Sequence, residues 1–102
     1  MEWYHYFSGF WAGMFLANFV PHFVNGVSGN GFPTPFAKPP GKGLSSPVVN
    51  VLWALLNLIV GGLLFKVGKV SLHNYLSLLL FFIGFALLSL LMAKNFANKD
   101  KA

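Results

Sequence analysis

Apolar residues dominate three long stretches of the chain, and most polar residues fall between them. The stretches run from about residue 3 to 25, from 47 to 65 and from 72 to 93. A helix over any of them can cross the roughly 30 Å hydrocarbon layer of a bilayer. The pattern predicts an all-α integral membrane protein, a single domain over residues 1–102 with three transmembrane helices and a polar tail at 94–102.

The first stretch has two distinct sides when it is drawn as a helix. Gly9, Gly13 and Ala17 recur every fourth residue, which is the spacing that lets two helix backbones approach closely in a membrane. The adjacent side gathers these residues: Trp11, Asn18, His22 and Asn25. Its Asn and His side chains either bond to neighbouring helices in a packed bundle or form a polar wall.

The second stretch begins with a recognisable helix start. Ser46 suits the N-cap and Pro47 suits the first helical position. One stripe of this helix then carries Asn50, Asn57 and Gly61. An amide without a hydrogen-bond partner costs several kcal/mol in lipid, on the order of the transfer penalty of a peptide group. The stripe is therefore expected to face protein or a water-filled cavity.

A short link, residues 66–71, joins the second stretch to the third. Gly68 can end a helix in the left-handed conformation, and Ser71 can cap the next helix. The two stretches are thus predicted to form an antiparallel hairpin. Most of the third helix should face lipid, because its only polar or small stripe is modest; that stripe consists of His73, Ser77 and Gly84.

The segment 26–46 interrupts this apolar pattern. It contains four of the six prolines and five of the eleven glycines. A disordered loop should be polar and charged, whereas this one carries Phe32 and Phe36. Prolines also lower the entropy that a chain loses when it orders. We therefore expect an ordered loop, either re-entrant or lying in the interface, with both phenylalanines packed between the helices.

The end of this loop is a candidate anion site. Glycines, a lysine and a serine directly precede the second helix: Gly41, Lys42, Gly43 and Ser45. Free backbone N–H groups, the helix dipole and a cation all favour an anion there, with His22 nearby. The alternative is a tight turn, a capped helix and a lysine that reaches lipid phosphates. A Walker A loop is excluded, because glycine follows the Gly-Lys pair.

Composition strengthens the membrane interpretation and excludes several chemistries. Of 102 residues, 56% are hydrophobic and 9% are charged, which is far fewer charges than a soluble domain carries. There is no cysteine, and Glu2 and Asp100 are the only acidic residues. Carboxylate-driven proton exchange and carboxylate or thiolate metal sites therefore lack their residues. We expect no cofactor and no bound metal.

The lysines predict an orientation. With three spans, the 26–46 loop and the C-terminus lie on one side of the membrane. That side has more lysine than the other, so it is assigned to the cytoplasm of a cell (inner or plasma) membrane, with the N-terminus outside. The net charge of +5 then suits anionic lipid headgroups and not nucleic acid. The two sets are Lys38, Lys42, Lys94, Lys99 and Lys101 against Lys66 and Lys69.

Three helices are too few to enclose a pathway, so we expect a homo-oligomer or a place in a larger membrane complex. Its contacts would be the Gly9, Gly13 and Ala17 side and the Asn50, Asn57 and Gly61 stripe. The oligomer would bind or pass a small anionic or neutral solute, with the 26–46 loop as gate or site. The candidate ligand-binding residues are Asn18, His22, Asn25, Gly41, Lys42, Gly43, Ser45, Asn50 and Asn57.

Two other functions stay open at this stage. The chain is alternatively a structural or accessory subunit, with the loop as its docking surface. More distantly, it is a membrane-embedded enzyme that uses His22 as a base. The serines available to that histidine have no acid to orient the pair, so we do not expect an enzyme.

Overall fold

The computed structural model describes residues 2–40 and 42–99 and contains three helices. They are α1 (Trp3–Val27), α2 (Pro47–Val67) and α3 (Tyr75–Phe96). The prediction of an all-helical chain with three helices is confirmed. Gly41 and Lys101, which belong to the predicted anion site and to the lysine count, lie outside the described residues.

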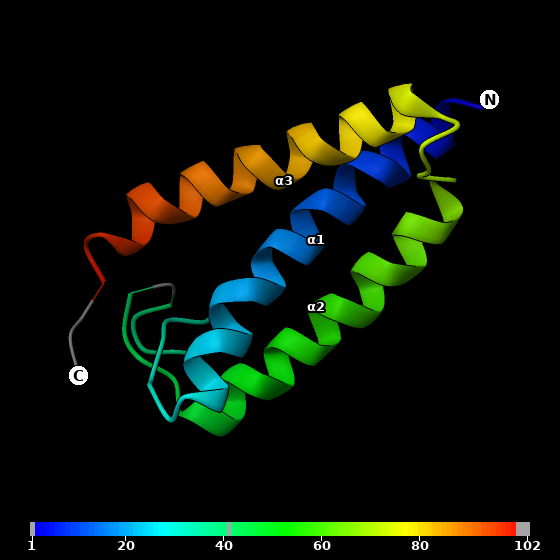
Figure 1. Cartoon of the computed structure of the whole chain (residues 1–102). Coiled ribbons are helices and arrows are strands. Elements are labelled where there is room, and N and C mark those ends of the chain that lie inside the picture. The colour runs from blue at the N-terminus through cyan, green and yellow to red at the C-terminus, as the bar shows by residue number, and fades with distance from the viewer. Residues whose placement is uncertain (1, 41, 100–102) are drawn as a thin grey trace.

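Helix α1 lies between the other two (Figure 1). It packs along both α2 and α3, whereas no Cα atom of α2 lies within 8 Å of one in α3. The predicted hairpin is therefore wrong in one respect: α2 and α3 are antiparallel neighbours in sequence, but α1 separates them. Near the link, the rings of Phe65 and Phe81 still meet, with centroids 5.2 Å apart.

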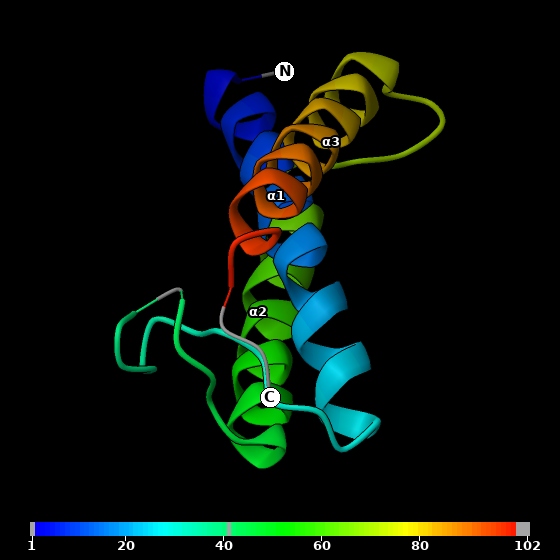
Figure 2. The ribbon, with the colours of Figure 1, turned by 90° about the vertical axis from the view of Figure 1, so that its left-hand side faces the viewer.

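The molecule is elongated, with principal extents of 45 × 23 × 19 Å. Figures 1 and 2 show that α2 and α3 start close together at their link and diverge toward the other end. The N-terminus lies near the link. The loop that joins α1 to α2 and the end of α3 both lie at the diverging end, so the loop fills part of the space that α3 leaves open.

Small residues make the contact between α1 and α3. A Cβ atom added at Gly13 would lie 2.7 Å from the backbone nitrogen of Phe85, and one added at Gly84 would collide with the carbonyl oxygen of Phe10. The side of α1 that the sequence assigned to a partner chain is thus used inside this chain. The reason is that α3 returns along it.

The start of α3 differs from the sequence prediction. Asn74, and not Ser71, takes the N-cap position, because a turn closed by the Asn74 N–H and the Ser71 carbonyl (3.2 Å) comes first. The left-handed residue of the link is Lys69, with φ 51°, while Gly68 keeps a right-handed φ of −71°. Gly68 packs its backbone against α1 at Gly9, so close approach is the role of this glycine.

Two of the described helices are long and apolar enough to cross a membrane. Mean hydropathy reaches 2.2 in α2 and 2.6 in α3, and only 22% and 11% of those segments are buried inside the chain. Helix α1 does not reach the same threshold, because its apolar run contains polar side chains. Three of these polar residues, Asn18, His22 and Asn25, lie toward the loop end of α1, where the site described next is built.

Candidate functional site

Asn50, in the first turns of α2, joins the loop to the helices. Its Nδ2 group donates to the carbonyl oxygens of Phe32 (3.0 Å), Ser45 (3.2 Å) and Ser46 (3.0 Å), and the side chain is 0% exposed. Three carbonyl neighbours leave no doubt which end of the amide carries the nitrogen. The Oδ1 atom of Asn50 must therefore face the fourth neighbour, which is His22.

His22 lies opposite Asn50 on α1 and is 2% exposed. Its Nδ1 atom is 2.7 Å from Asn50 Oδ1, and because that oxygen can only accept, Nδ1 carries the proton and donates. Nε2 then holds a lone pair in the neutral ring and has no hydrogen-bond partner among the described residues. The imidazole ring is surrounded by the rings of Phe32, Trp53 and Phe96, whose centroids lie 5.3, 6.4 and 6.4 Å from its own.

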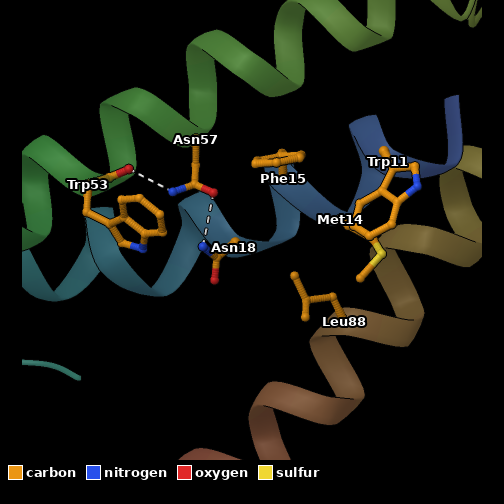
Figure 3. A pocket seen from close by; sticks show the side chains of 7 residues that line it. All are labelled: Trp11, Met14, Phe15, Asn18, Trp53, Asn57 and Leu88. Carbon is orange, nitrogen blue, oxygen red and sulfur yellow. Dashed lines mark hydrogen bonds between the residues drawn. The ribbon is translucent and has the colours of Figure 1, made fainter. Parts of the chain in front are cut away.

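A second amide pair joins α1 to α2 two turns further from the loop. Asn18 Nδ2 donates to Asn57 Oδ1 at 3.0 Å, and Asn57 Nδ2 donates to the carbonyl oxygen of Trp53 at 2.8 Å (Figure 3). Asn25 is different, because its amide bonds only to Pro21 of its own helix, at 2.8 Å. The structure thus brings together four of the predicted polar residues in two pairs and leaves Asn25 apart.

The loop closes on itself above this site. Phe32 and Ser45 pair their backbones, with N–H to O distances of 3.2 and 3.0 Å, and Thr34 Oγ1 lies 2.6 Å from Ser45 Oγ. Phe32 is buried against His22, as expected. Phe36 is 64% exposed and meets the Trp53 ring edge-on, with ring centroids 5.2 Å apart. The prediction that both phenylalanines pack between the helices is therefore wrong for Phe36.

Three described backbone N–H groups of the predicted anion site are already bonded. Those of Lys42 and Gly43 donate to the carbonyl oxygen of Pro39 at 3.1 and 2.8 Å, and that of Ser45 donates to Phe32. The Ser46 hydroxyl caps the first turn of α2, and the Lys42 side chain is exposed. The loop therefore uses these three N–H groups for its own turns, so they are not free donors; the anion site as a whole stays a prediction, because Gly41 lies outside the described residues.

A cleft of about 340 Å³ opens beside His22. Its polar atoms come from α1, α2 and the end of α3, and prolines of the loop form the opposite wall. A second cleft of about 250 Å³ adjoins it (Figure 3). The lining residues of the first are Asn18, His22, Pro33, Thr34, Pro35, Pro40, Trp53, Asn95 and Phe96.

Trp53 is the residue of this cleft that sequence reasoning missed. Its indole Nε1 atom is buried and has no hydrogen-bond partner in the described part of the chain, although a buried tryptophan N–H usually has one. The available signal was its position one turn before Asn57, on the same side of α2 as the amide stripe. A tryptophan in an apolar segment is normally a packing residue, so the position alone carried no chemical meaning.

No group of three metal-ligating side chains forms among residues 2–40 and 42–99. The site offers hydrogen-bonding chemistry: one indole donor, one imidazole acceptor and the amide of Asn18, all at one cleft. No protein family model matches the chain, and neither curated proteins nor solved structures match it.

Proposed function

We propose that all three helices span a cell membrane, with the loop and C-terminus in the cytoplasm. The support is the apolar character of α2 and α3, together with the place of α1 between them. A helix that packs along two spanning helices shares their depth. The described lysines at the loop end, Lys38, Lys42, Lys94 and Lys99, outnumber Lys66 and Lys69 at the other end, which favours this orientation and contact with anionic headgroups.

The function that the site supports best is binding of a small polar solute in the cleft beside His22. The observation that carries this proposal is the pair of unpartnered atoms at one cleft, Trp53 Nε1 and His22 Nε2. A buried polar group without a partner costs about 1–3 kcal/mol. Trp53 Nε1 is such a group, and a ligand that hydrogen-bonds to it removes that cost. Convergent polar groups in an otherwise apolar cleft are typical of binding sites.

Binding is favoured over passage through the amide stripe. Asn50 and Asn57 are 0% and 2% exposed and are bonded within the chain. A water-filled path would need these amides to face it. Neither Asn50 nor Asn57 lines the cleft beside His22, and the loop covers one wall of that cleft.

Nuclear magnetic resonance of indole ¹⁵N–H groups tests the proposal directly. Trp3, Trp11 and Trp53 give three signals, which phenylalanine variants assign. Glycerol and sodium phosphate, added in turn to the protein in nanodiscs, serve as neutral and anionic probes. We expect a saturable shift of the Trp53 signal, with Trp3, which is 72% exposed, as internal control. The absence of saturable shifts with both probes would contradict a solute site.

An accessory role in a larger membrane complex is the second candidate. The observation in its favour is that large apolar side chains cover the outer faces of α2 and α3, and the exposed ring of Phe36 stands out from the loop. A homo-oligomer would also have to use these faces, since the small-residue side and the amide stripe are covered. Purification in mild detergent, followed by mass determination with and without Phe36→Ala, distinguishes a partner-bound form from a monomer.

A further inference from the structure

Two clefts of different character share one wall. Asn18 and Trp53 line both the cleft beside His22 and the adjoining one. Figure 3 shows these two residues at one end of the adjoining cleft, with Trp11, Met14 and Leu88 toward the other. A ligand seated at His22 can therefore extend past Asn18 into the second cleft without leaving the surface of α1.

The adjoining cleft is apolar beyond that shared wall. Its remaining lining is Trp11, Met14, Phe15 and Leu88, with Asn57 contributing an amide that is already bonded twice. Helix α3 supplies Leu88 and α1 supplies the rest of the apolar side chains. Such a surface takes a hydrocarbon chain, and the cleft has a volume of about 250 Å³.

The polar cleft selects the headgroup. His22 Nε2 and the Oδ1 atom of Asn18 are acceptors that have no partner among the described residues, and the Asn95 amide also lines the cleft. Trp53 Nε1 is a donor in the wall of the cleft, buried and without a partner among the described residues. No lysine in the described part of the chain lines this cleft; the Lys99 ammonium lies over the ring of Phe32, 5.8 Å from its centroid. A carboxylate or phosphate would meet two acceptors without a counter-charge. A hydroxyl both donates and accepts.

We propose that the two clefts together bind a single-chain amphiphile with an uncharged, hydroxyl-bearing headgroup. The headgroup lies between His22 and Trp53, and the acyl chain lies along Phe15 and Leu88. This inference rests on the proposed function and narrows it, because it excludes anionic solutes and adds the hydrocarbon chain.

Equilibrium binding to the full-length protein in nanodiscs tests the inference with three probes. They are 1-decanoylglycerol, decanoate at pH 8 and glycerol. Because a hydrogen bond contributes about 0.5–1.5 kcal/mol, we expect 1-decanoylglycerol to bind saturably and at least about threefold more tightly than decanoate. Each buried methylene adds to affinity, so glycerol should bind at least about tenfold more weakly.

Two variants test the headgroup contact and the acyl-chain contact of the ligand separately. Trp53→Phe keeps the ring and removes the N–H donor, and should weaken 1-decanoylglycerol binding about three- to tenfold. Leu88→Trp fills the apolar cleft and should weaken 1-decanoylglycerol binding while leaving glycerol unchanged. Leu87→Trp is the matched control, because Leu87 is exposed and lines neither cleft.

The other outcomes are distinguishable. If decanoate binds as tightly as 1-decanoylglycerol, the proposed preference for an uncharged headgroup is wrong. If glycerol binds as tightly as 1-decanoylglycerol and Leu88→Trp has no effect, the solute site stands and the acyl-chain cleft is wrong. If no probe binds, both the inference and the proposed function fail. A change of oligomeric state in Leu88→Trp but not in Leu87→Trp assigns the apolar cleft to a second copy of the chain, against the inference.

Discussion

Helix α1 packs on its two neighbours by different means. Against α2 it uses side-chain hydrogen bonds, of which His22 to Asn50 and Asn18 to Asn57 are the main ones. Against α3 it uses close backbone approach at Gly13 and Gly84, and similar close approach at Gly26 and Gly61 accompanies the hydrogen bonds with α2. In lipid, where helices gain little from hydrophobic burial against each other, both means are available. Only the first depends on the chemical identity of a few polar atoms.

The difference also explains where the cleft lies. The glycine contact holds α3 close to α1 in the half nearer the link, and α3 then diverges from α2 (Figure 2). At the diverging end, side chains of α1 hydrogen-bond to the asparagines of α2. The loop and Phe96 cover part of the space between α2 and α3. The two hydrogen-bonded pairs between α1 and α2 therefore lie toward the end where α2 and α3 separate, whereas Gly9 and Gly13 meet α3 toward the link.

The largest expected effect comes from placing a large side chain in the glycine contact between α1 and α3. Gly13→Leu forces a side chain into the backbone of α3 at Phe81 and Phe85, and should lower the free energy of unfolding by about 3 kcal/mol or more. Unfolding in mixed detergent micelles measures it. Gly62→Leu is the control, since a Cβ at Gly62 meets nothing within 4 Å; equal losses in the two variants would contradict the contact.

Removing the central amide should have the next largest effect. Asn50→Leu keeps the volume but leaves His22 Nδ1 and the loop carbonyl oxygens without their partner, which should cost about 2–3 kcal/mol. The same unfolding assay applies. Asn25→Leu, which breaks only a bond within α1, should cost clearly less. If the two substitutions prove equivalent, the α1–α2 contact does not depend on its polar atoms.

Amide hydrogen exchange examines the loop that these bonds hold. The N–H groups of Phe32, Gly43 and Ser45 are bonded and should exchange at least about tenfold more slowly than expected for an unstructured chain. Asn50→Leu should remove this protection, because Asn50 bonds to the carbonyl groups on both sides of the loop. Rapid exchange throughout residues 31–46 of the unsubstituted protein would make the loop a flexible linker.

The smallest effect is expected at the lysine that the sequence placed in an anion site. Lys42 is exposed and lines neither cleft. Lys42→Ala should shift the melting temperature by less than about 2 °C and leave the Trp53 response to glycerol unchanged. A loss of that response would show that Lys42 takes part in the binding site.

The sequence by itself determined the three helices and their ends to within a few residues. Runs of apolar residues and the Ser46–Pro47 start are local signals, and the backbone obeys them wherever the helices lie. The sequence also identified Asn18, His22, Asn50 and Asn57 as residues that need partners, because a buried amide or imidazole in an apolar segment must be bonded.

Only the tertiary structure decided which partners these residues have. Three features depend on how the chain returns to α1. Gly9 and Gly13 face α3, and α1 separates α2 from α3. Trp53 Nε1 is left without a partner at the cleft. Of the donors in the predicted anion site, the Gly43 N–H bonds across a turn to Pro39 and the Ser45 N–H bonds to Phe32, which is far away in sequence. Pairings between distant residues are set by packing, and no local pattern encodes them.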